Sequence, residues 1–191
     1  MRCLSGLLIC AALGLAPVTA LGDARHIDAA QSKLTVFVYR GGFFAFAGDN
    51  HQINAPVASG ELDTDPLSAV SLTIQTANMT VVDPQSNADK RAQVQARMLG
   101  PDVLDTGTYP AITFTSTSIQ ATASGGWDVT GALTIHGTTR TITLHVTEAS
   151  GHYRGSTTLK QTDFGIRPVT IAGGAVKVKD EIKIDFDIVT Q

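Results

Sequence analysis

The feature that most constrains this chain is a two-residue alternation of apolar and polar side chains. It is clearest in "VKVKDEIKIDFDI" at residues 176–188. One face of this segment carries Val176, Val178, Ile182, Ile184, Phe186 and Ile188. Asp180 alone interrupts that apolar row. Because successive side chains of a β-strand point to opposite faces, the pattern predicts a strand with one buried and one solvated face.

The same alternation recurs along the chain and predicts an all-β protein of about eight antiparallel strands. The expected strands cover residues 34–40, about 53–62, 70–76, 112–119, 127–135, 141–146, 153–159 and 176–188. Turn-forming pairs such as Gly125-Gly126 and Gly137-Thr138 separate several of them. The even spacing favours a barrel or a sandwich, and the alternation alone leaves this choice open.

The first expected strand departs from the pattern, because both of its faces are apolar. Leu34, Val36 and Val38 share one face. Phe37 and Tyr39 lie on the other. We therefore expect the outer face of this strand to be covered by a helix or by another chain.

One short helix is expected in "SNADKRAQVQARML" at residues 86–99. Ser86 followed three residues later by Asp89 resembles a capping box, and Gly100-Pro101 would end the helix. Its apolar stripe is modest, which favours a helix that lies across the barrel or its open end.

The N-terminal residues have the pattern of a secretory signal. An apolar stretch over residues 4–16 is followed by the small-residue sequence "VTA", so we expect a cleavable signal peptide over 1–20 and one domain over 21–191. Both cysteines of the chain lie in the expected signal, which leaves the exported domain without a thiol or a disulfide. No later segment approaches the ~20 continuous apolar residues of a membrane-spanning helix.

The charge of the chain argues against two classes of partner. Its formal net charge is -3, with acidic and basic groups interspersed. A nucleic-acid partner usually requires a clear basic patch, so none is expected. The acidic balance also argues against binding to an anionic membrane surface.

The residues give little support for catalysis or for a metal site. The expected domain contains neither a cysteine nor a Gly-x-Ser-x-Gly nucleophile motif. No two of its five histidines are spaced as in the usual zinc motifs. We therefore expect no metal and no other cofactor. His136, in "TIHGTT", is expected to order a turn.

The stretch "FFAFAGDNH" at residues 43–51 is the most chemically suggestive. Its polar end, Asp49-Asn50-His51, suits a tight turn, a polar lip for the head group of a ligand, or an acid–base centre at His51. Asp49 is the one nearby carboxylate that could orient His51. These three interpretations stay open.

Several segments together resemble the YceI-like family, the lipid- or polyisoprenoid-binding proteins of the bacterial periplasm. They are "IDAAQSKLTVFVYRGGFFAFAGDNHQI", "VLDTGTYPAITFTST", "VTGALTIHGTTRTITLHV", "LKQTDFGI" and "VKVKDEIKIDFDIV". The resemblance implies a periplasmic location and an extended lipocalin-like antiparallel β-barrel with an apolar lumen. Its motif positions in this sequence are Tyr109, Pro110, His136, Gly137, Asp163, Phe164 and Gly165. In the subgroup most similar to this chain, His-Asp-His often follows the aromatic run, whereas Gly48 stands at the first of these positions here.

These observations predict a non-enzymatic exported protein that holds an isoprenoid, a polyprenol or a quinone in its lumen. The predicted ligand contacts are Phe43, Phe44, Phe46, Phe114 and Phe164, with His51 and Asp163 as head-group partners. Two alternatives stay open. One is a metal- or histidine-dependent enzyme that uses His51, and the other is a filled barrel that forms a homodimer through the outer face of its first strand.

Overall fold

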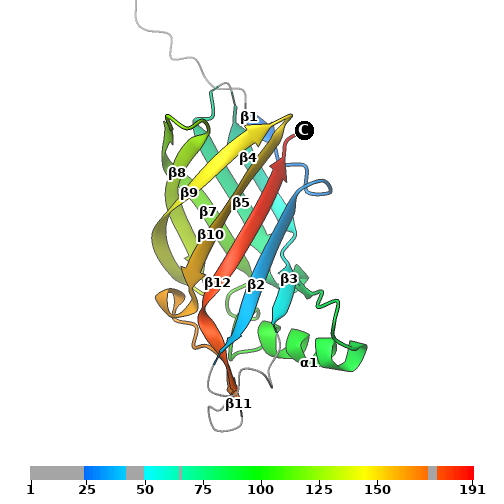
Figure 1. The fold of residues 1–191 in the computed structure, drawn as a ribbon. Coiled ribbons are helices and arrows are strands. Elements are labelled where there is room, and N and C mark those ends of the chain that lie inside the picture. The colour runs from blue at the N-terminus through cyan, green and yellow to red at the C-terminus, as the bar shows by residue number, and fades with distance from the viewer. Residues whose placement is uncertain (1–23, 42–49, 65, 172–175) are drawn as a thin grey trace, which may run out of the picture.

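A computed structural model describes residues 24–41, 50–64, 66–171 and 176–191, so the expected signal peptide lies outside it (Figure 1). The strands are β1 (Ala24–His26), β2 (Lys33–Gly41), β3 (His51–Asn54), β4 (Val57–Asp63), β5 (Ala69–Gln75), β6 (Thr80–Val81), β7 (Ala111–Ala121), β8 (Trp127–Ile135), β9 (Thr138–Ala149), β10 (His152–Lys160), β11 (Thr170–Ile171) and β12 (Val176–Val189). The α-helix is α1 (Ala88–Leu99), and the 3-10 helices are η2 (Thr76–Asn78) and η3 (Gln161–Phe164).

The described strands form one antiparallel sheet that curls strongly around a single interior (Figure 1). Their order is β1-β4-β5-β7-β8-β9-β10-β12-β2-β3-β6, with β11 paired to β12. β1, β6 and β11 are only two or three residues long. Because β3 and β4 are two halves of one kinked run, eight longer segments make the wall. The predicted all-β, lipocalin-like barrel with one short helix is confirmed.

The kink between β3 and β4 joins the two ends of the curled sheet. A single strand was predicted at about 53–62, but it is interrupted at Ala55-Pro56. Pro56 has no N–H to donate to a strand partner. The N–H of Ala55 donates to the carbonyl of Leu34 over 2.9 Å. β3 then pairs with β2 and β4 pairs with β5, so one run of chain bridges both edges.

The first described strand closes the same gap farther along the wall. β1 pairs with β4, and the next residue, Ile27, forms a bridge with Thr190 at the end of the chain. Ile27 N donates to Gly60 O over 2.9 Å, and Asp28 N donates to Val189 O over 2.8 Å. β1 and the C-terminus therefore lie side by side at one end of the barrel (Figure 1).

α1 forms where it was predicted, with a different capping residue. The side chain of Asn87, rather than Ser86, caps it by accepting a hydrogen bond of 2.9 Å from the N–H of Lys90. This geometry satisfies one of the amides that a helix N-terminus leaves unpaired. The helix ends at Gly100, as expected.

One glutamine attaches α1 to the end of the barrel opposite β1 and the C-terminus (Figure 1). Gln95 Oε1 accepts from Val81 N, and Gln95 Nε2 donates to Met79 O, each over 2.7 Å. These bonds pair main-chain groups of Val81 in the short edge strand β6 and of Met79, the residue before it. They also hold the buried side chain of Met98 against the interior.

The single exception in the apolar row of β12 is explained by a bulge. The register of β12 against β2 shifts between Val178 and Ile182, and Asp180 lies within the shift. Asp180 accepts hydrogen bonds from the hydroxyl of Thr162 over 2.7 Å and from its N–H over 2.9 Å. These bonds, the hydroxyl first, lower the pKa of Asp180 below its usual value.

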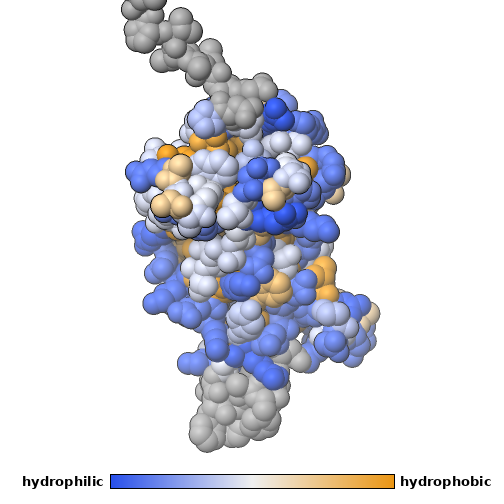
Figure 2. Space-filling view, turned by 45° about the horizontal axis from the view of Figure 1, so that its top comes forward, coloured by the Kyte–Doolittle hydropathy of each residue, from blue (hydrophilic) through white to orange (hydrophobic). Residues whose placement is uncertain are grey.

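The outer face of β2 receives part of its cover from the neighbouring strand. Phe37 and Tyr39 are half-buried, and Lys183 Nζ of β12 lies 5.7 Å from the centroid of the Phe37 ring. The sequence predicts that a helix or another chain covers this face. Within the described residues, the aliphatic stem and the ammonium group of Lys183 supply part of that cover. Figure 2 shows a mostly hydrophilic surface on the face in view, with hydrophobic side chains in small separate areas.

Candidate functional site

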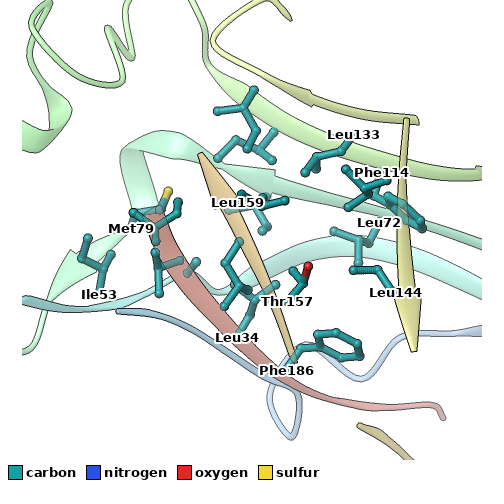
Figure 3. A pocket seen from close by; sticks show the side chains of 18 of the residues that line it. Leu34, Ile53, Leu72, Met79, Phe114, Leu133, Leu144, Thr157, Leu159 and Phe186 are labelled. Carbon is teal, nitrogen blue, oxygen red and sulfur yellow. The ribbon is translucent and has the colours of Figure 1, made fainter. Parts of the chain in front are cut away.

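The interior of the barrel contains a cavity of about 190 Å³ (Figure 3). Inward side chains from both halves of the sheet line it, together with residues of α1 and η3. Among the described lining residues, only Tyr153, Thr157 and Gln161 carry a polar side-chain group. An apolar cavity of about 150 Å³ stays dry and accepts a benzene-sized molecule. This lumen therefore has the size and lining to take up a slender apolar group.

The alternation in the sequence makes the lumen apolar, because paired residues of neighbouring strands point to the same side. Phe114 of β7 lies opposite Leu133 of β8, and Val36 of β2 lies opposite Ile184 of β12. All four line the cavity. Their sequence neighbours point outward, and most of these are polar, with Phe37 of β2 an exception.

One end of the barrel is organised by the expected turn at His136. His136 and Gly137 have φ values of 50° and 71°, which is the left-handed pattern of a two-residue hairpin between β8 and β9. The ring centroids of His136 and Tyr109 are 4.2 Å apart. A Cβ at Gly137 would lie 2.5 Å from Tyr109 Cε1, so glycine is needed for both the turn and the contact. His136 thus shapes the turn.

The other motif positions also have structural roles at this end. Thr76, which is almost fully buried, donates its hydroxyl to Tyr109 O and its N–H to Pro110 O, each over 2.9 Å. Phe164 of η3 points into the interior, and Gly165 ends η3 with a φ of 75°. These contacts connect η2, η3 and the β8–β9 hairpin around the lumen.

Apart from His51, the predicted ligand contacts fall into three groups. Phe114 and Phe164 are 4% and 3% exposed and line the cavity. Asp163 is exposed on η3 and is not among the lining residues. The aromatic run Phe43, Phe44 and Phe46 lies outside the described residues. Contact of any of these residues with a ligand stays a prediction.

His51 has a carboxylate partner that the sequence analysis did not identify. Its Nδ1 lies 2.6 Å from Oδ2 of Asp83, and Asp83 Oδ1 accepts from Gln52 N over 2.6 Å. The side chains of His51 and Asp83 are 17% and 3% exposed. Asp49, the expected partner, lies outside the described residues. No local pattern relates two residues that are 32 positions apart.

His51 lies on the inner face of β3, since it is paired with Val38 and stands two residues before Ile53. Both neighbours line the cavity, whereas His51 itself does not. Its buried carboxylate partner fixes the orientation of the ring. This arrangement suits a hydrogen bond from Nε2 to a polar group at the end of the lumen.

Two features are absent from the part of the chain that the structure describes. No group of three or more His, Cys, Asp or Glu side chains within this part of the chain is arranged to hold a metal ion. Within the same residues, no helix is long and apolar enough to span a membrane.

Most of the lumen could not be identified from the sequence, because alternation does not show which face of a strand lines it. Leu72, Leu144 and Ile184 are predicted as apolar strand positions, and the structure places all three in the lining of the cavity. Thr157 is not among the residues predicted to contact a ligand. Thr157 stands two residues before Leu159 in "GSTTLK", so the two side chains lie on the same face of the strand. This spacing is the pattern from which an inward Thr157 could have been predicted.

The family model of the YceI-like domain matches residues 26–190, nearly the whole described chain. The chain belongs to the YceI-like family. Among solved structures it is similar to BcnA of Burkholderia cenocepacia, with a TM-score of 0.64 and 25% identity over 86% of this chain and 99% of that one. It also shares its fold with the Campylobacter jejuni YceI protein, with a TM-score of 0.52 and 17% identity over 73% and 81% of the two chains.

A mutant CJ YceI protein solved with a monobromobimane guest matches with a TM-score of 0.55 and 18% identity, over 69% of this chain and 80% of that chain. A UPF0312 protein of Pseudomonas savastanoi is 31% identical over 110 residues, which cover 52% of this chain and 53% of that protein. A UPF0312 protein of Vibrio parahaemolyticus is 32% identical over 116 residues, 55% and 59% of the two chains. The match thus spans about half the length of these curated relatives.

Proposed function

We propose that this YceI-like protein is exported to the periplasm, where it binds the hydrocarbon part of a lipid-like amphiphile such as an isoprenoid, a polyprenol or a quinone. The observation that carries the proposal is the lumen of about 190 Å³ with its almost entirely apolar lining. The signal-like pattern over residues 1–20 supports export.

The energetics favour a long chain over a short one. Burial of each methylene contributes about 0.8 kcal/mol. Association costs on the order of 4–15 kcal/mol in lost freedom, so roughly 5–19 buried methylenes are needed to offset this cost. For the longer chains of this range we expect the half-buried lining side chains, such as Leu72 and Leu144, to shift and enlarge the cavity of about 190 Å³.

His51 keeps its predicted part as head-group partner in this proposal. Its ring lies on the inner face of β3, and its Nδ1 is held by Asp83. A hydrocarbon chain in the lumen would bring a terminal hydroxyl or carbonyl within reach of the other ring nitrogen.

Native mass spectrometry of gently purified protein tests the proposal. We expect a complex with a co-purified lipid, or with added long-chain quinone or polyprenol. A bare polypeptide mass that persists after addition of both guests would overturn the proposed function.

A matched pair of variants on β9 locates the guest. Leu144 points into the lumen and Thr143 is exposed on the outer wall. Leu144→Trp should narrow the lumen and reduce the fraction of loaded protein several-fold, whereas Thr143→Trp should leave that fraction unchanged. Equal occupancy in the two variants would show that the guest does not lie in the lumen.

A further inference from the structure

One hydroxyl group interrupts the apolar lining near the middle of the lumen. On β10, Tyr153, Thr157 and Leu159 point inward. Thr157 is paired with Ile184 of β12, which also lines the cavity. Along the strand it lies roughly 13 Å from Tyr153. Figure 3 shows the Thr157 oxygen among apolar side chains.

The hydroxyl of Thr157 has no hydrogen-bond partner among the residues that the structure describes. Threonines of the outer wall differ in this respect. Thr130 and Thr143 pair their hydroxyls over 2.8 Å, as do Thr134 and Thr139. The Thr157 hydroxyl is also not among the fully buried orphan atoms, because it borders the cavity.

Strand propensity does not explain a threonine at this position. Valine and isoleucine favour strands as strongly, and they fill most of the equivalent inward positions. A hydroxyl that leaves water without a partner costs about 1–3 kcal/mol. A buried water usually needs about three polar partners, and the polar lining residues Tyr153 and Gln161 lie toward the two ends of β10. The described lining residues thus leave the Thr157 hydroxyl with a hydrogen bond still to be made.

We infer that Thr157 selects guests that carry a carbonyl oxygen within their apolar part, such as a ketone, an ester or an amide, over pure hydrocarbons. This inference rests on the proposed function. The hydroxyl donates to the carbonyl oxygen, while the apolar lining holds the chain on both sides of it. A hydrocarbon of the same length leaves the hydroxyl unpaired, which is a penalty that a carbonyl guest avoids.

The test offers the full exported protein an equimolar mixture of a mid-chain ketone and the alkane of the same carbon number. Native mass spectrometry then gives the ratio of the two complexes. We expect the wild-type protein to prefer the ketone by on the order of fivefold, as one net hydrogen bond implies. Thr157→Val keeps the shape of the side chain and should bring this ratio close to one. Thr157→Ser should retain the preference.

Thr158, the next residue, is exposed on the outer wall, and Thr158→Val should leave the ratio unchanged. The alkane alone should bind to Thr157→Val at least as well as to the wild-type protein, and the empty variant should be no less stable. A ketone preference that survives in Thr157→Val overturns the role of Thr157 and leaves the proposed function intact. If neither guest binds to the wild-type protein while an added polyprenol does, the inference fails and the proposed function stands; if the polyprenol and a long-chain quinone also fail to bind, both fail.

Discussion

The buried pair of His51 and Asp83 provides a quantitative test of the structure. Asp83 accepts two hydrogen bonds of 2.6 Å, from His51 Nδ1 and from Gln52 N. Bonds to a charged acceptor contribute about 1.5–3 kcal/mol each, and Asp83→Ala removes both of these bonds. We therefore expect Asp83→Ala to lower the free energy of unfolding by about 3–5 kcal/mol.

A double-mutant cycle isolates the contact between the two side chains. Urea unfolding of the wild-type protein, His51→Ala, Asp83→Ala and the double variant gives the coupling energy. We expect about 1.5–3 kcal/mol, because both side chains are largely shielded from water. A large Asp83→Ala effect combined with a small coupling would assign the stability to the Gln52 contact instead.

The chain contains a matched control on its outer wall. His145 Nδ1 lies 3.0 Å from Asp128 Oδ1, but these side chains are 49% and 51% exposed. The same cycle on this pair should give at most about 1 kcal/mol, since exposed ion pairs contribute little. Equal coupling in the two cycles would refute the argument that burial makes the His51–Asp83 contact strong.

The same His51→Ala variant tests the head-group proposal. If His51 binds the polar end of a guest, the variant should load less of a polyprenol while its loading with an alkane changes little. Equal losses for both guests would instead indicate a general disturbance of the lumen.

Three further predictions concern the wall and its turns. Asp180→Asn should be less stable than the wild-type protein at neutral pH. Because the folded pKa of Asp180 is lowered, first by the Thr162 hydroxyl, this difference should shrink as pH falls below about 4, and urea unfolding that shows a constant difference would contradict it. Gly137→Ala should cost about 1–3 kcal/mol from its left-handed backbone and the Tyr109 contact, so an unchanged urea midpoint would count against it. Leu133→Ala should cost about 2–5 kcal/mol and admit a bulkier guest, which thermal unfolding and native mass spectrometry check; unchanged stability would show that this side chain is not packed in the core.

Most of the local structure could be predicted from the sequence. The alternation predicted the long strands, and "SNADKRAQVQARML" predicted α1 to within a residue or two at its start. The helix cap was assigned to Ser86 rather than Asn87, because both residue types cap helices and their choice depends on the backbone geometry. The interruption at Ala55-Pro56 could have been predicted, because a proline within an expected central strand argues against a continuous strand.

The residues of the candidate site could be predicted from the sequence only in part. Phe114 and Phe164 were selected as aromatic residues, and the structure places both in the lining of the cavity. Asp163 neighbours Phe164 in the sequence but points to solvent, since adjacent side chains need not share a side of the chain.

By itself, the sequence determined that this chain forms strands with one apolar and one polar face, because that pattern depends on neighbours two residues apart. Only the tertiary structure decided which faces enclose a lumen, since that follows from curling of the sheet and from closure at Ile27 and Thr190. Pairing of β6 with β3 brings Asp83 to His51, and curling of the sheet turns the Thr157 hydroxyl toward an apolar cavity. These contacts join residues from separate strands and loops, and a local pattern carries no information about such distances.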